Sequence, residues 1–344
     1  MRKFLFLFLV FLLLSSTGCS NKEPEKESTE KVITNSEKVE ESIPETSPPI
    51  STKEPLVKEN KELPGAFIVS IDNHRNAYPH SGLNQADRVY EILAEGGITR
   101  YLAVFHSNQA EKIGPIRSAR YYFAYIAKGH DLPFAHAGGS AEALDLIAKL
   151  KLKDFDEIYN SGAYFQRDKS RKPPHNLYTS TELMVTGANK KGYELLSLKP
   201  LPLGKDMPGG EPISLVDITY STDPKYLYTV TYEWDGARFK RYINGIPHKV
   251  LTGEEIYTEN VIVMAAKTRE YMDGKILKSN IEIIGGDKAF FFTNGQVYRG
   301  SWKKSNAESE FEFYVDGKPM KFFGQHAWIN VVPSLDAVTF KKID

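Results

Sequence analysis

The sequence is nearly free of cysteine, because Cys19 is the only one among its 344 residues. A disulfide framework and a thiolate zinc site both need several cysteines, so both are excluded. Lysine plus arginine and aspartate plus glutamate number 44 each, which gives a formal net charge of zero. Without a positive surplus there is no general counterion release to drive nucleic-acid binding, so we expect no nucleic-acid partner.

The longest apolar run in the sequence is too short to cross a membrane as a helix. It covers residues 4–14, eleven in all, and would rise only about 16 Å against a hydrocarbon core of roughly 30 Å. Arg2 and Lys3 precede it, and small residues lead from it to Cys19. This order is typical of a secretory signal, so we predict a signal peptide over residues 1–18.

Cys19 directly follows Thr17 and Gly18, and this order resembles a lipobox. In a lipobox the cysteine receives a diacylglycerol and becomes the new N-terminus; the alternative is an ordinary signal with a cysteine nearby. Two acyl chains, at about 0.8 kcal/mol for each buried methylene, give a lasting anchor. We therefore expect a lipoprotein held at the extracytoplasmic face of the cell membrane through diacylglycerol on Cys19, with the membrane as its first partner.

Residues 19–63 join this anchor to the rest of the chain, and from residue 20 onward they contain no aromatic side chain. Glu, Lys, Ser, Thr and Pro dominate the segment. Such a composition buries too little apolar surface to offset the entropy of ordering. We predict a disordered linker, with an end-to-end distance of roughly 40 Å, that tethers the folded part to the membrane.

Apolar runs and helix-like spacings alternate over residues 64–205, and this alternation predicts an α/β domain. Pro115 and Gly129 stand where a helix favours its first turn and its end. Proline and glycine are frequent between residues 199 and 210, so we place a domain boundary near residue 205. The expected strands cover residues 65–71, 98–105 and 133–137, and the expected helices cover 85–94, 116–128 and 141–150.

Residues 206–344 have a different pattern, which predicts an antiparallel, β-rich domain. Residues 228–234 alternate between apolar and polar, turn at Asp235-Gly236 and return over 237–243. Asn-Gly and Asp-Gly pairs favour the positive φ of tight hairpin turns, so we expect a succession of hairpins. Further pairs of this kind begin at Asn244, Asp273, Asn294 and Asp316.

Several strings in the folded part resemble the YerB-like lipoproteins of Gram-positive bacteria. In the first half they are Ile71-Asp-Asn-His74, Ser81-Gly-Leu-Asn-Gln-Ala-Asp87, Glu95-Gly-Gly-Ile-Thr-Arg100, Ile113-Gly-Pro-Ile-Arg-Ser-Ala-Arg120, His136-Ala-Gly-Gly-Ser140 and Pro174-His-Asn-Leu-Tyr178. In the second half they are Gly300-Ser-Trp-Lys-Lys304 and Gly324-Gln-His-Ala-Trp-Ile-Asn330. The resemblance covers about residues 64–342. It implies a two-domain surface lipoprotein of unassigned biochemical activity, and it implies no catalytic residues.

Arg117 and Arg120 lie three apart in the expected first turn of the second helix, where they would face the same side. Cations there oppose the helix dipole, so an anionic group should compensate them. One interpretation is a buried network with Glu91, Glu95 or Asp87. The other is a pocket in which guanidinium groups grip phosphate or carboxylate. The candidate anion-binding residues are Arg100, Arg117, Arg120, Arg171, Gly138, Gly139 and Ser140; for Ser140 a plain helix cap is the alternative.

A second group of residues forms a candidate polar site without a recognisable metal motif. Its histidines have no helical or hairpin ligand spacing, so we predict no metal and no other cofactor, with hydrogen-bonding or turn-capping roles as the alternative. No Gly-x-Ser-x-Gly elbow is present, which argues against a Ser-His-Asp hydrolase. Trp302 and Trp328 could stack on sugars, but packing in the core is the interpretation we favour. The members of the polar site are Asp72, His74, Glu95, His136, His175 and Asn176.

Two classes of function fit the sequence. The first is a binding or scaffolding lipoprotein of the cell envelope that engages a cell-wall component or another envelope protein. The long linker, the neutral charge and the lack of a catalytic motif favour it. The second is an enzyme or binder of a pyrophosphate-linked substrate, polyprenyl or glycopolymer, that acts through the arginines. The order of arginines, glycine loop and later arginine is faintly similar to the LytR-CpsA-Psr transferases, which hold a polyprenyl pyrophosphate with arginines.

Overall fold

The computed structural model describes residues 65–204, 207–274 and 276–343. The signal peptide expected over residues 1–18, Cys19 and the linker expected over 19–63 lie outside the described residues. The described residues belong to a single compact unit.

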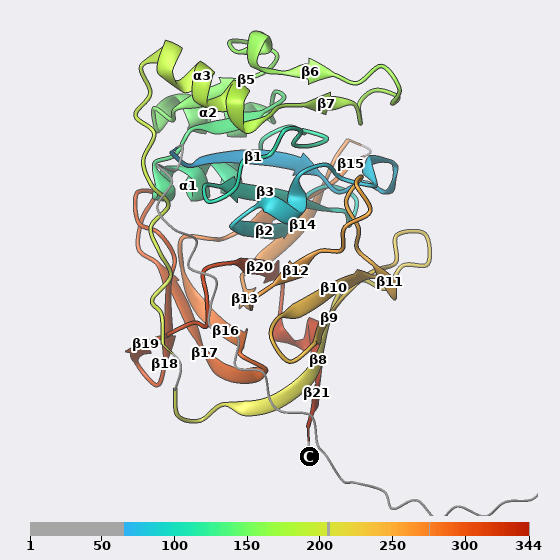
Figure 1. The fold of residues 1–344 in the computed structure, drawn as a ribbon, viewed down its shortest axis with the longest axis vertical. Coiled ribbons are helices and arrows are strands. Elements are labelled where there is room, and N and C mark those ends of the chain that lie inside the picture. Colours follow the sequence, from blue (N-terminus) through green and yellow to red (C-terminus); the bar gives the residue numbers. More distant parts are fainter. Residues whose placement is uncertain (1–64, 205–206, 275, 344) are drawn as a thin grey trace, which may run out of the picture. The chain divides into compact units, whose positions relative to one another are not determined.

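The first region combines a mixed sheet with helices (Figure 1). β1 runs parallel to β4, and β4 to β5, whereas β3 is antiparallel to both β1 and β2. The order across this part of the sheet is therefore β5-β4-β1-β3-β2. The elements are β1 (Phe67–Asp72), β2 (Arg88–Leu93), β3 (Thr99–Phe105), α1 (Tyr121–His130), β4 (Phe134–His136), α2 (Ala141–Lys149), β5 (Asp154–Asp156), β6 (Gln166–Arg167), β7 (Leu177–Tyr178) and α3 (Thr181–Lys191).

The prediction of a helix over residues 85–94 is wrong, because most of this segment is strand β2. Every residue of β2 is buried, since the strand lies inside the sheet between β3 and β20 (Ala327–Val332). A strand that is covered on both faces has no polar face, so its sequence does not alternate. Its apolar residues can then imitate helical spacing.

The helix predicted over residues 116–128 begins later than expected, at Tyr121. The preceding segment runs extended between β1 and β4: the Asp72 amide donates to the Pro115 carbonyl at 2.8 Å, and the Ala137 amide donates to the Arg117 carbonyl at 3.1 Å. Arg120 is the N-cap residue of α1, with extended backbone angles. Arg117 and Arg120 therefore do not share a first helical turn, and this part of the prediction is wrong.

The second region is β-rich and mostly antiparallel. Within it, β20 runs parallel to β13, and β20 also pairs in parallel with β2 of the first region. The β2–β20 pairing joins the two regions in one sheet, in which β1, β3, β2 and β20 follow one another (Figure 1). The remaining strands are β8 (Glu211–Ser221), β9 (Tyr228–Trp234), β10 (Phe239–Ile243), β11 (Ile246–Pro247), β12 (Tyr257–Thr258), β13 (Asn260–Ala265), β14 (Thr268–Asp273), β15 (Ile276–Ile281), β16 (Gly285–Thr293), β17 (Gln296–Lys304), β18 (Glu312–Val315), β19 (Lys318–Pro319) and β21 (Val338–Lys342).

The predicted fold class is confirmed: an α/β region precedes a β-rich, antiparallel one. The hairpin turns are confirmed as well. Asn244, Asn294 and Asp316 have φ values of 48°, 48° and 50°, and the glycine after each is also at positive φ. Two successive residues at positive φ match the twist of a two-residue hairpin turn. The boundary near residue 205 stays a prediction.

Both faces of the sheet carry a hydrophobic core. Successive side chains of a strand point to opposite faces, so neighbouring residues of β1 contribute to opposite cores. Ile68 packs in the core that contains Phe123 of α1, and Val69 packs in the core that contains Trp328 of β20. Residues of both regions meet in each core. The carboxyl end of β1 is thus held by packing from both sides.

Candidate functional site

Asp72 is the last residue of β1, and three nitrogen donors contact its carboxylate. Its Oδ1 accepts from the His74 amide at 3.0 Å, and its Oδ2 lies 2.7 Å from His175 Nδ1 and 3.4 Å from Arg117 Nε. Burial raises the pKa of Asp72, but the positive charge of Arg117 and the His74 amide outweigh burial and bring this pKa below the ordinary 3.8. Asp72 is therefore ionised at neutral pH.

Glu95 forms the second carboxylate of the same cluster. Its Oε2 lies 3.1 Å from Arg100 Nη2, and its Oε1 pairs with Arg120 Nη2. Arg100 also donates to the Ser118 carbonyl at 2.7 Å. Three arginines therefore face two carboxylates, which leaves a surplus of one positive charge before any histidine is protonated. We call the group the β1-end cluster; its members are Asp72, His74, Glu95, Arg100, Arg117, Arg120 and His175.

Two members of the β1-end cluster have unused hydrogen-bonding capacity. The Arg117 side chain is 31% exposed, and its contact with Asp72 involves Nε, so neither Nη atom has a partner among the described residues. The His175 side chain is 12% exposed, and its Nε2 likewise has no partner among the described residues. The His175 ring stacks on His74, with centroids 5.0 Å apart. The cluster can thus accept an anion at Arg117 and a proton at His175.

Arg171 belongs to the loop of His175 and binds three backbone carbonyls and a tyrosine hydroxyl instead of joining the arginines. Its Nη1 donates to the Pro79 carbonyl at 3.1 Å and to the Tyr178 hydroxyl at 2.7 Å; its Nη2 donates to the carbonyls of Asn76 and Tyr78, at 3.0 Å each. These bonds fasten the loop around residue 175 to the loop after Asp72. Asn176, the neighbour of His175, accepts from Arg167 at 3.3 Å and donates to the Asp168 carbonyl at 3.4 Å, outside the cluster.

Several polar groups of the loop between β4 and α2 are already paired. His136 is fully buried, and its two ring nitrogens contact the Gly138 carbonyl and Asp154 Oδ1, both at 2.8 Å. The Gly138 amide donates to Asp156 Oδ1 at 2.8 Å. Ser140 caps α2 by accepting from the Ala143 amide at 3.3 Å, which is the plain cap that the sequence left open. Gly139 forms a bridge with Ala119.

A small cavity adjoins the other side of the cluster. It measures about 270 Å³ and lies between the N-termini of α1 and α2 and the β14–β15 hairpin. Arg120, Glu95, Ser140 and Lys278 are among the residues that line it. In the described part of the chain, no three His, Cys, Asp or Glu side chains are arranged to hold a metal ion.

Sequence reasoning missed a second polar network, buried where the two regions join. Glu91 of β2 and Arg241 of β10 are both fully buried, with Glu91 Oε2 2.7 Å from Arg241 Nη2. Arg241 also pairs with His248 Nδ1, and its guanidinium lies 4.1 Å from the centre of the Trp328 ring. The signal for Arg241 was its position in β10: it lies two residues after the buried Phe239, and residues two apart in a strand face the same side. No signal marked Glu91 as its partner, 150 residues away.

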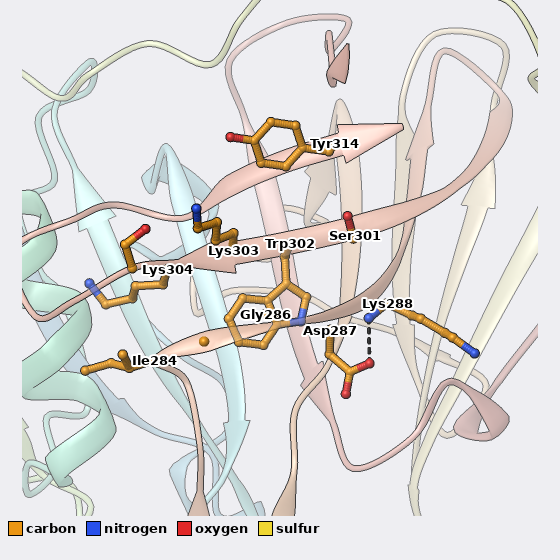
Figure 2. A pocket seen from close by; sticks show the side chains of 11 residues that line it. Ile284, Gly286, Asp287, Lys288, Ser301, Trp302, Lys303, Lys304 and Tyr314 are labelled. Atoms are coloured by element: carbon orange, nitrogen blue, oxygen red, sulfur yellow. Dashed lines mark hydrogen bonds between the residues drawn. The ribbon is translucent and has the colours of Figure 1, made fainter. Parts of the chain in front are cut away.

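Trp302 and Trp328 are core residues, as we favoured from the sequence, since each is only 3% exposed. Trp302 donates its Nε1–H to the Ala265 carbonyl at 2.6 Å. It also borders an open groove of about 860 Å³ over β16 and β17. Figure 2 shows Lys288 and Lys304 extending away from Trp302 in opposite directions, so the lysines of this groove do not converge on one point.

The N-terminal and C-terminal domains of a "Protein of unknown function (DUF3048)" family match residues 51–194 and 216–329. "Putative lipoprotein YerB" of Bacillus subtilis (strain 168) is 34% identical over 280 residues, which are 80% of this chain and 83% of YerB. The crystal structure of the Bacillus subtilis YerB protein is similar with a TM-score of 0.73 and 32% identity, and covers 81% of this chain and 94% of that one.

Among the described residues, none of the helices has both the length and the apolar character to cross a membrane. The resemblance to YerB-like proteins is confirmed over both regions, and the relative that matches is named as a lipoprotein. The chain belongs to the DUF3048 family and is related to YerB over 80% of its length.

Proposed function

We propose that the protein is a lipid-anchored, extracytoplasmic binding protein of the cell envelope, and that its β1-end cluster takes an anionic ligand. The observation that carries this proposal is Arg117, a partly exposed arginine beside a buried carboxylate, whose two Nη atoms have no partner among the residues the structure describes. A guanidinium with free Nη atoms can grip phosphate or carboxylate through two parallel hydrogen bonds.

The position of the cluster supports the proposal. β1, β4 and β5 are parallel, and Asp72 stands at the carboxyl end of β1. In α/β sheets, ligands bind in the crevice outside the carboxyl ends of the strands, because loops of several strands converge there. Here the loops around residues 74, 117 and 175 supply a backbone amide and two side chains that contact Asp72.

The charge of the cluster favours a phosphate-bearing ligand. One positive charge remains after Asp72 and Glu95 are paired, and an anion of the cell wall or of a lipid carrier would compensate it. A pyrophosphate-linked polyprenyl or glycopolymer substrate fits the same chemistry, so the second class of function that the sequence left open uses this site too. The Gly138–Ser140 loop is not part of the proposal, because the Gly138 amide and the Ser140 side chain are already bonded.

The test is to measure, by calorimetry, the equilibrium binding of inorganic pyrophosphate to the full-length protein in detergent. Arg117→Gln removes the charge and both free Nη donors. We expect binding 10- to 100-fold weaker, because a hydrogen bond to a charged group contributes about 1.5–3 kcal/mol.

Arg238→Gln is the matched control. Arg238 is an arginine with a 54% exposed side chain that lies 3.8 Å from Asp235 in a turn of the second region, so its loss should leave the affinity unchanged. Absence of pyrophosphate binding by the unmodified protein would refute the anion site. Equal losses in the two variants would refute it as well, since the effect would then be one of general charge.

A further inference from the structure

His175 differs from the other histidines that meet carboxylates in the described residues. Both ring nitrogens of His136 are bonded, and so are both of His130, to Tyr90 and Glu310. His326 lies 3.7 and 3.8 Å from its two carboxylates, beyond hydrogen-bond distance. In the part of the chain that the structure describes, only His175 has one nitrogen held by a carboxylate, at 2.7 Å, and the other without a partner.

The contact with Asp72 fixes the proton of neutral His175 on Nδ1, because an ionised carboxylate can only accept. Nε2 then carries a free lone pair, which is the form that a general base requires. A carboxylate in this position holds the imidazole in the productive tautomer and stabilises the imidazolium that forms when Nε2 takes a proton.

Hydrogen bonds and a ring contact hold the loop that carries His175. Three hydrogen bonds of Arg171 hold its loop against the loop that follows Asp72, and a fourth goes to the Tyr178 hydroxyl. The His175 amide donates to the Lys172 carbonyl at 3.1 Å, and the imidazole stacks on His74. Arg171 is thus a positioning residue: it fastens the backbone on either side of the Asp72–His175 contact.

Arg117 places an anion next to the base. Its Nε and His175 Nδ1 approach the same atom, Asp72 Oδ2, so the two side chains lie side by side. The surplus of one positive charge in the cluster matches the single negative charge of a phosphodiester. An anion bound by Arg117 would therefore lie beside His175, whose Nε2 is the ring nitrogen that can hold a water molecule.

From this geometry we propose that the β1-end cluster hydrolyses a phosphodiester, with His175 as the general base and Arg117 as the group that binds the phosphate. His175 Nε2 takes a proton from water while the water oxygen bonds to phosphorus. The bond from phosphorus to one ester oxygen breaks, and that oxygen leaves with the proton that the imidazolium returns. The products are an alcohol and a phosphomonoester, and His175 is neutral again. This proposal rests on the anion site described under the proposed function.

The test measures release of 4-nitrophenol from bis(4-nitrophenyl) phosphate by the full-length protein in detergent. His175→Gln can still donate to Asp72 but cannot take a proton, so we expect the rate to fall 100- to 10,000-fold, the usual contribution of a general base. Binding of inorganic pyrophosphate should change by no more than a few-fold in this variant, because Arg117 is intact. His326→Gln, a change in a 43% exposed histidine, should keep the full rate.

Three results would overturn the inference. If the unmodified protein binds pyrophosphate but hydrolyses the diester no faster than buffer does, the catalytic proposal fails while the anion site stands. If it neither binds nor hydrolyses, both proposals fail. If His175→Gln hydrolyses at the full rate and only its melting temperature falls, His175 is a structural residue that pins its loop.

Discussion

At the residue scale, the ion pair of Glu91 and Arg241 is the most deeply buried one in the described part of the chain. Both side chains are fully buried, and hydrogen bonds from Tyr228 and Asn73 reach the same carboxylate. A buried charge that loses its partner stays desolvated without compensation. Replacing only one member of the pair should therefore destabilise the junction between the two regions.

Arg241→Met tests this pair. We expect it to lower the free energy of unfolding by about 3–5 kcal/mol, because Glu91 is left buried and unpaired. Urea unfolding of the full-length protein measures the loss. The double variant Glu91→Gln with Arg241→Met should recover part of it, and Lys267→Met, in an exposed pair with Glu282, should cost less than about 1 kcal/mol. Equal losses at Arg241 and Lys267 would contradict the argument.

His80 adds a pH dependence to the same network. Burial lowers the pKa of His80 from 6.5 to about 4. Between these values the unfolded chain binds a proton that the folded protein does not, so folding stability falls as pH falls from about 6.5 to 4. His248, whose pKa burial and the nearby Arg241 lower well below 6.5, acts in the same direction.

His80→Gln should therefore flatten the pH dependence of unfolding over this range. A pKa lowered from 6.5 to about 4 corresponds to roughly 3 kcal/mol of stability lost on acidification. Urea midpoints between pH 7 and 4 measure the slope, which does not depend on how much the substitution itself destabilises the protein. The exposed His326→Gln is the control, and an unchanged slope in His80→Gln would refute the assignment.

At the element scale, the sequence predicted what depends on local signals. Hairpins of the second region were predictable because Asn-Gly and Asp-Gly pairs fix the turn by their own backbone preferences. β2 was not predictable, because its burial on both faces depends on β20, more than 200 residues later. Arg100, Arg117 and Arg120 were among the candidate residues, but the placement of Arg117 and Arg120 on a helix was wrong, since the pairing of residues 115–117 with β1 is a tertiary effect.

The Asn294-Gly295 turn gives a prediction at this scale. Gly295 has φ of 68°, and a Cβ atom there would lie 2.7 Å from Trp234 Nε1. Gly317, with φ of 71°, stands in an equivalent turn with nothing within 4 Å. Alanine at either site meets the same backbone strain, of order 1 kcal/mol. Gly295→Ala must also displace the indole, so we expect it to lower the melting temperature clearly more than Gly317→Ala; equal shifts would contradict this.

At the scale of the whole molecule, the sheet shared by the two regions explains how the site is supported. The β1-end cluster belongs to the first region, whereas the Glu91–Arg241 pair and both cores bind that region to the second. The loop after Asp72 takes part in both networks: His80 Nε2 contacts the Asp72 carbonyl at 2.7 Å, and His80 Nδ1 lies 3.3 Å from His248 Nε2. The second region therefore helps to hold the loops that carry the candidate site.

The expected membrane anchor can be tested at Cys19. If Cys19 is the lipidated residue, Cys19→Ala removes the only thiol that could carry the diacylglycerol. We expect the variant to lose incorporation of labelled palmitate and to leave the washed membrane fraction, since an uncleaved eleven-residue apolar run is a weaker anchor than two acyl chains. Ser20→Ala changes the neighbouring residue and should leave both readouts intact. Retention of label and unchanged fractionation in Cys19→Ala would show that the anchor lies elsewhere, while the anion site could still be tested on that variant.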